Sequence, residues 1–232
     1  WEGPFSALIS AIPTTEGKQR AFEELTLLFP EEPHFWAHLG RFYSRVIQDH
    51  RKAHEAHQRA LDLAEADPVL RHMAGMAWRA EVYDVLNSAS VSGGLSPELE
   101  AHIQAAVRQA GREFDEARRL DLRSEYNYVS QIQLIERVLG VLAHLKGFLN
   151  DVPRFLAISG NLRYRELLDD AEELLAQLSR ARAGEVPSRF QQDARSRLDK
   201  LYGDHSKAIE GWTNMLDRAD VYRPPMRRLI VH

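Results

Sequence analysis

The sequence predicts an all-α protein made of antiparallel helix pairs stacked one on another. Apolar residues recur at the three- to four-residue spacing of amphipathic helices along nearly the whole chain, whereas the two-residue alternation typical of strands is almost absent. Proline and glycine interrupt this pattern at intervals, so the chain divides into about a dozen helices joined by short connections.

The N-terminal part is expected to form helices over residues 5–12, 14–29, 34–47, 50–66 and 68–86. Thr14 or Thr15 can cap the second helix, because a hydroxyl oxygen accepts a hydrogen bond from the first free backbone amides. Proline ends or precedes several of these helices, at Pro13, Pro30 and Pro68.

Residues 87–97, with the sequence NSASVSGGLSP, are rich in serine and glycine and are expected to form a flexible, dispensable loop. Val91 and Leu95 are its only large apolar residues. This loop divides the expected domain organisation into residues 1–86, with the first helix pairs, and residues 98–232, which continue the same array to a truncated end.

The C-terminal part is expected to form helices over residues 97–120, 124–146, 151–159, 161–182, 187–202 and 204–217, with an incomplete one over 224–231. Ser96 and Pro97 suit the N-cap and first position of a helix. The helix over 124–146 is apolar around most of its circumference, which is typical of a buried central helix.

One segment has the first-helix pattern of a known repeat. Trp36, Leu39, Gly40 and Tyr43 read W-x2-L-G-x2-Y, and their spacing places them on one helix face. This pattern resembles the tetratricopeptide repeat, and it implies a solenoid of helix pairs in which the glycine lets the two helices approach closely. Partial copies of the repeat follow at Ala53, His57, Ala60, Gly75, Trp78, Ala110, Phe114, Ala117, Ala208, Trp212 and Met215.

The repeat pattern also predicts a buried core at the helix-pair interfaces. Its expected members are Trp36, Leu39, Tyr43, Trp78, Phe114 and Trp212.

Two stretches are similar in sequence to the helical-repeat region of sterile-alpha-motif antiviral proteins and their bacterial relatives. They are EPHFWAHLGRFYSRV and KAHEAHQRALDLAEADPVLRHMAGMAWR. Those antiviral proteins are signal-transduction NTPases of the STAND class, and the resemblance implies a regulatory, sensing or assembly role. The chain has no G-x-x-x-x-G-K-[ST] loop, because Gly17-Lys18 is followed by Gln19 and lacks the preceding glycine. We therefore interpret it as a piece of a larger protein without the NTPase.

The amino-acid composition argues against several classes of protein function. There are 30 Lys+Arg against 34 Asp+Glu, a net charge of −4, which argues against a dedicated nucleic-acid binder. The absence of cysteine excludes disulfides and thiolate sites. No apolar run reaches the roughly 20 residues of a membrane helix, so no membrane partner and a cytoplasmic location are expected.

A basic and partly aromatic stripe is expected on the helix face opposite the repeat residues. On the 34–47 helix it spans about 60° and consists of His34, His38, Arg41 and Arg45. On the 68–86 helix it consists of His72, Met76, Arg79 and Tyr83. In tetratricopeptide arrays such a stripe lines the concave groove, so the resemblance implies binding of an acidic peptide, a C-terminal carboxylate or a phosphate. The alternative is a solvated face or one paired with the chain's own carboxylates.

Other chemistries have weaker support. His50, His54 and His57 have helical spacing that could serve a metal, but no HExxH pattern accompanies them. No nucleophile elbow or other catalytic pattern is present, and no cofactor is expected.

The expected function is therefore a non-catalytic interaction, sensor or scaffold module with a protein or acidic-peptide partner. The alternatives are a nucleic-acid-binding helical module attached to an effector domain, and an oligomerisation arm that acts by self-association.

Overall fold

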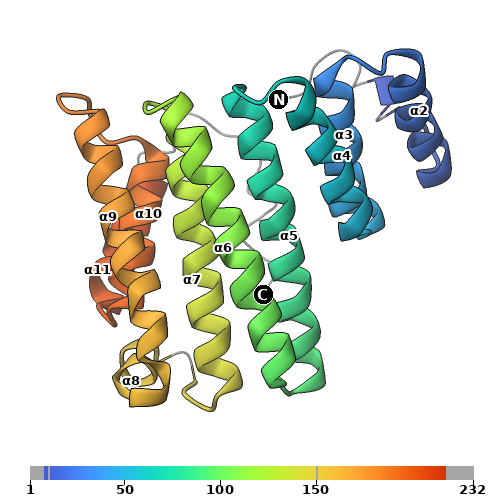
Figure 1. The fold of residues 1–232 in the computed structure, drawn as a ribbon. Helices are drawn as coiled ribbons and strands as arrows, with labels where there is room; N and C mark the ends of the chain where they lie inside the picture. The colour runs from blue at the N-terminus through green and yellow to red at the C-terminus, as the bar shows by residue number, and fades with distance from the viewer. Residues whose placement is uncertain (1–7, 10, 150, 218–232) are drawn as a thin grey trace. The chain divides into compact units, whose positions relative to one another are not determined.

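The computed structural model describes residues 8–9, 11–149 and 151–217, and every regular element in these ranges is helical (Figure 1). The all-α prediction is therefore confirmed for this part of the chain. The helix expected over 224–231 lies outside the described residues, and so does half of the one expected over 5–12. No described helix combines the length and the apolar character that crossing a membrane requires.

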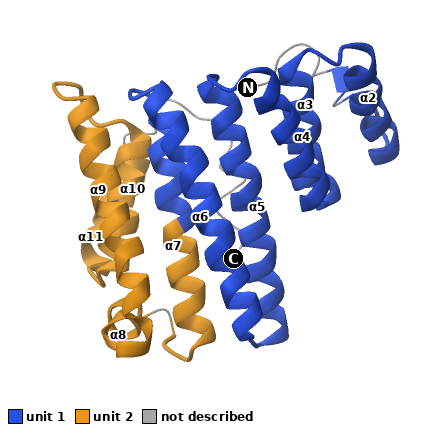
Figure 2. Ribbon diagram, viewed as in Figure 1, with its two compact units in different colours: residues 1–134 blue, residues 135–232 orange. Residues whose placement is uncertain are grey.

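The chain forms two compact units, residues 1–134 and 135–232 (Figure 2). The division falls within one helix and not at residues 87–97, where the sequence suggested a boundary. The reason is that α5 and α6, the two helices on either side of that segment, pack extensively on each other.

Unit 1 consists of α2 (Thr15–Leu28), α3 (Pro33–Phe42) with its π-helical extension η1 (Tyr43–Ile47), α4 (His50–Leu63), α5 (Pro68–Ser92), α6 (Pro97–Leu120) and the first part of α7 (Tyr126–Leu145). Helix α3 packs mainly on α4, and α5 mainly on α6. The two pairs are joined through contacts of α5 with both α3 and α4, so consecutive helices in this unit form a connected stack.

Side-chain caps fix several helix starts. Thr14 Oγ1 accepts a hydrogen bond from the Gly17 amide, and Ser96 Oγ accepts one from the Leu99 amide. Asp67 caps α5 by accepting from two backbone amides, at 2.7 and 3.2 Å. These are the positions at which the sequence predicted the helices to begin, because each cap needs only local residues.

The expected loop over 87–97 is wrong for residues 87–92, which continue α5 as far as Ser92. Ala89 is buried, and Ser90 Oγ donates back to the Leu86 carbonyl, so serine and alanine are accommodated within the helix. Gly93, with φ of 68°, ends α5 in a left-handed conformation that glycine adopts at little cost. The connection to α6 is thus shortened to residues 93–96.

The predicted core is correct in part. Leu39, Tyr43 and Phe114 are buried. The three tryptophans, Trp36, Trp78 and Trp212, are half-buried instead.

Hydrogen bonds from the indole N–H groups explain why two of these tryptophans are only half-buried. Trp36 Nε1 donates to the Pro30 carbonyl at 2.9 Å, and Trp212 Nε1 donates to Asp193 Oδ1 at 3.1 Å. An indole that must satisfy its donor is held at the edge of the core, with its ring only partly enclosed.

Gly40 lies where α3 and α4 approach closely, as the repeat pattern predicted. A Cβ atom at Gly40 would lie 2.7 Å from His57 Cδ2 and 3.0 Å from the Ala53 carbonyl oxygen. The same relation holds in the next pair, where a Cβ atom at Gly75 would lie 2.8 Å from the Phe114 ring. In each pair a glycine of the first helix therefore receives a ring from the second.

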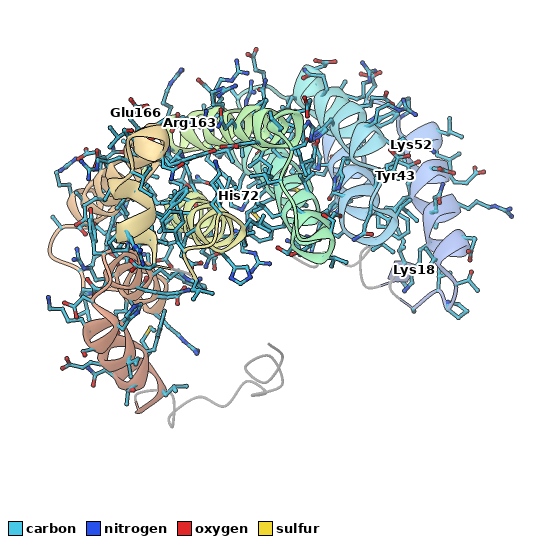
Figure 3. All side chains as sticks on the ribbon, turned by 90° about the horizontal axis from the view of Figure 1, so that it is seen from below. Lys18, Tyr43, Lys52, His72, Arg163 and Glu166 are labelled. Carbon is cyan, nitrogen blue, oxygen red and sulfur yellow. The ribbon has the colours of Figure 1, made fainter. Side chains whose placement is uncertain are left out.

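Tyr43 connects three helices (Figure 3). Its hydroxyl donates to Glu23 Oε1 on α2 at 2.7 Å, and Lys52 Nζ of α4 lies 5.3 Å from its ring centroid. Burial and the hydrogen bond to Glu23 raise the pKa of Tyr43. This cluster orients the packing face of α3, and so the opposite face of that helix.

Unit 2 contains the rest of α7, α8 (Val152–Ala157), the 3-10 helix η2 (Ser159–Tyr164), α9 (Arg165–Ala181), α10 (Arg189–Leu201) and α11 (His205–Asp217). Helices α10 and α11 pack extensively on each other. Glu136 of α7 accepts from Arg197 at 3.1 Å and from Lys200 at 2.6 Å, both on α10. The apolar residues of α7 are largely buried, as predicted: Val129, Ile132, Leu134, Ile135, Val138, Leu139 and Leu142.

Candidate interaction face

The α3 half of the predicted stripe lies opposite the packing face of that helix. Leu39 and Gly40 are buried, whereas His34 and His38 are half-buried and Arg41 is exposed. The helix begins at Pro33, and Glu32 caps it by accepting a hydrogen bond from the His34 amide.

Arg45 belongs to the same stripe but lies on η1, the π-helical extension of α3. It is exposed, and the segment ends at Gln48 with φ of 61°. The wider turn of a π-helix shifts Arg45 relative to its expected position on an ideal α-helix.

The α5 half of the stripe is half-buried, because its side chains bond to the first part of α7. His72 Nδ1 lies 2.9 Å from Asn127 Oδ1, and the His72 ring is 5.5 Å from that of Phe114. Figure 3 shows His72 directed toward α7. His72 is therefore less accessible to a ligand than a groove-lining residue is expected to be.

Arg79 also bonds to α7. Its Nη1 donates to the Ser130 carbonyl at 3.4 Å and lies 3.7 Å from Met76 Sδ, while its guanidinium lies 5.1 Å from the Tyr83 ring centroid. The Tyr83 hydroxyl donates to the Gln133 carbonyl at 3.3 Å. Because Ser130, Met76 and Tyr83 are all neutral, these contacts position the guanidinium without cancelling its charge.

The electrostatic surroundings of the stripe are cationic. Burial lowers the pKa of His38, and the positive charges of Arg41 and His34 lower it further. Burial also lowers the pKa of His72; the hydrogen bond with Asn127 opposes this, and the charges of Arg79 and Arg45 reinforce it. Arg45 of η1 and Arg79 of α5 thus both act on His72, so the two halves of the stripe are neighbours.

We name the basic residues of this stripe the α3–α5 face: His34, His38, Arg41, Arg45, His72 and Arg79. Asp67 is a carboxylate that approaches it, with Oδ2 at 3.6 Å from His34 Nε2. Within the described part of the chain, no ion pair of Arg41 is found.

A second cluster of polar groups joins α4, α5 and α6. Glu81 Oε2 lies 2.6 Å from His54 Nε2 and its Oε1 lies 2.8 Å from His102 Nε2, while His50 Nε2 lies 3.0 Å from Asp84 Oδ2. His54 also stacks on Trp78, with ring centroids 3.6 Å apart.

The spacing of His50, His54 and His57 suggested metal ligands, and the structure pairs the first two with carboxylates instead. Among the described residues, no group of three or more His, Asp or Glu side chains converges as a metal site would require. Sequence reasoning missed the partners Glu81 and His102, because they come from other helices and no local spacing indicates the pairing.

Comparison with known proteins adds no assignment. No protein-family model matches the sequence, and a search of curated proteins gave no significant match.

Proposed function

We propose that this chain is a non-catalytic interaction module whose α3–α5 face binds an acidic segment of a partner protein. The observation that carries the proposal is the cationic surroundings of His38 and His72, on which Arg41, Arg45 and Arg79 act. Like charges gathered on one face repel one another, and a carboxylate-rich partner would remove that repulsion.

Arginine suits this role because its planar guanidinium forms paired hydrogen bonds to a carboxylate. Arg41 is exposed on α3, and Arg79 is held in place by Met76, Tyr83 and Ser130. A fixed arginine loses little side-chain entropy when a ligand binds, so Arg79 is the pre-ordered part of the face.

The proposed scaffold is a tetratricopeptide-like solenoid. Its support is the repeated contact of Gly40 with His57 and of Gly75 with Phe114, one in each helix pair. The two glycines are 35 positions apart, close to the roughly 34-residue period of tetratricopeptide repeats. Stacked pairs of this kind offer a rigid extended surface.

The test uses a fluorescein-labelled decapeptide of alternating Glu and Asp, with binding followed by fluorescence anisotropy. Arg41→Ala should weaken binding about tenfold at moderate salt, because one charge-assisted hydrogen bond contributes about 1.5–3 kcal/mol. The matched control is Arg108→Ala, an exposed arginine on α6, which should bind as the wild type does. Equal affinity of the two variants would contradict the proposal.

The same assay separates the alternatives. A labelled RNA or DNA duplex that binds more tightly than the peptide, with a steep loss of affinity as salt rises, would favour a nucleic-acid module. Self-association without any peptide binding would favour an oligomerisation arm. Attachment to a STAND-type NTPase stays a prediction from the sequence resemblance.

A further inference from the structure

His57 has an unusual position for a histidine. It is fully buried between α3 and α4, and neither ring nitrogen has a hydrogen-bond partner. A buried imidazole nitrogen without a partner costs free energy, and an imidazolium there would cost far more.

The space around His57 leaves no room for a partner from α3. Its ring lies so close to Gly40 that a single added methyl group would clash at 2.7 Å. The backbone of α3 at Gly40 therefore lies directly against the ring, and separation of α3 from α4 would open this side of it to solvent.

The ionisable groups near His57 do not favour its protonation. His38 of α3 and His54 of α4 both act to lower its pKa, after the larger effect of burial, and the pKa falls to about 3. On α5, the carboxylate of Glu81 is bound to His54 and to His102 of α6. No carboxylate among the described groups is paired with His57.

We propose that His57 makes the α3–α4 pair an acid-sensitive latch, closed while the imidazole is neutral and opened locally when the surroundings become acidic. The geometry supports this latch, because the His57 ring is buried, its nitrogens have no hydrogen-bond partner, and it lies against the glycine of α3, Gly40. It does not depend on the proposed partner.

The direction of the effect follows from proton linkage. The opened state takes up a proton near the ordinary histidine pKa of about 6.5, and the closed state does not, so closure is favoured above that value and weakened below it. Between pH 7 and pH 5, His57 alone should raise the opening equilibrium constant about 25-fold. Burial lowers the pKa of His38 as well, so it acts in the same direction.

The experiment is amide hydrogen exchange of the whole chain at pH 7 and pH 5, corrected for the intrinsic exchange rate and resolved by peptide. In the wild type, protection of α3 and α4 should fall about 25-fold or more on acidification. In His57→Phe that fall should be smaller by about the same factor, because phenylalanine cannot take up a proton. Phenylalanine suits the position, since Phe114 occupies the matching place beneath Gly75.

His205→Phe is the matched control, because His205 is exposed at the start of α11 and should leave the acid response of α3 and α4 unchanged. An equal fall in the wild type and His57→Phe would overturn the proposal. If His57→Phe does not fold, the wild type labelled with 15N-histidine decides. A His57 ring that stays neutral at pH 5 while α3 is protected supports the latch, and one that titrates near the ordinary value of about 6.5 in the closed pair overturns it.

Discussion

Two glycines set how closely the helices of unit 1 approach. Gly40 lies against His57 and Gly75 against Phe114, each too close for a methyl group without displacement of the ring. Gly140 in α7 is different, because a Cβ atom there would meet nothing within 4 Å.

Gly40→Ala should therefore destabilise the protein by about 1–3 kcal/mol, since overpacking forces a ring or a helix to move. Gly140→Ala is the matched control and should stabilise by about 0.5–1 kcal/mol through helix propensity. Urea denaturation of the two variants measures both. Equal and favourable effects of the two substitutions would show that α3 and α4 do not approach so closely.

Phe114 is a fully buried large ring and Trp36 a partly buried one, so truncation of each tests the effect of burial on stability. Phe114→Ala should cost about 3–5 kcal/mol, because the ring is fully enclosed and its loss leaves a cavity beside Gly75. Trp36→Ala should cost clearly less, because the indole is half-buried. Thermal or urea unfolding of both variants provides the comparison, and a larger loss for Trp36 would contradict the difference in burial between the two rings.

At the scale of the helices, the cluster around Glu81 joins the first pair to the second. Burial by itself would raise the pKa of Glu81, but the hydrogen bond and charge of His54, with the charges of His102 and His50, bring it below 4.5. A carboxyl group with a lowered pKa stabilises the fold above its unfolded value, and that contribution is lost as the pH falls through the folded value.

Glu81→Gln should therefore cost about 1–3 kcal/mol at pH 7, where a charged acceptor is replaced by a neutral one. The difference from the wild type should shrink as the pH falls below the ordinary Glu pKa, because the unfolded chain then takes up a proton at Glu81, and it should vanish once the folded state is protonated as well. Glu24→Gln, at an exposed position of α2, is the control. A difference that stays constant from neutral pH down to complete protonation of Glu81 would mean that the carboxylate charge does not join these helices.

The helices themselves were largely predictable, because their signals are local. Thr14, Asp67 and Ser96 mark starts that need only the next three residues, and the structure uses all three as caps. The extent of α5 was not predictable in this way. Residues 87–92 are mostly weak helix formers, and their helical state depends on the burial of Ala89 by neighbouring helices.

The sequence predicted which residues of the candidate site share a helix face, but not which residues of other helices contact them. Helical spacing placed His72 and Arg79 on one face of α5. Their partners Asn127 and Ser130 lie 55 and 51 positions further along the chain, and only the packing of α7 brings them close. The same holds for Glu81 and His102, so sequence patterns within a helix identify a face and leave its neighbours open.

For the whole molecule, the residues with the proposed functions all belong to unit 1. The α3–α5 face, the Glu81 cluster and His57 lie within residues 1–134, and unit 2 has its own core around α10 and α11. This distribution makes α10 and α11 an internal reference in any experiment on the whole chain.

Chemical-shift mapping of the 15N-labelled chain, titrated with the acidic decapeptide, tests the interaction face most directly. The largest changes should lie over residues 34–45 and 72–83, and the Arg41 Nε–Hε signal should be among them, while α10 and α11 stay unchanged. Changes concentrated on α10 and α11, or none at millimolar peptide, would contradict the assignment of the α3–α5 face as the binding surface.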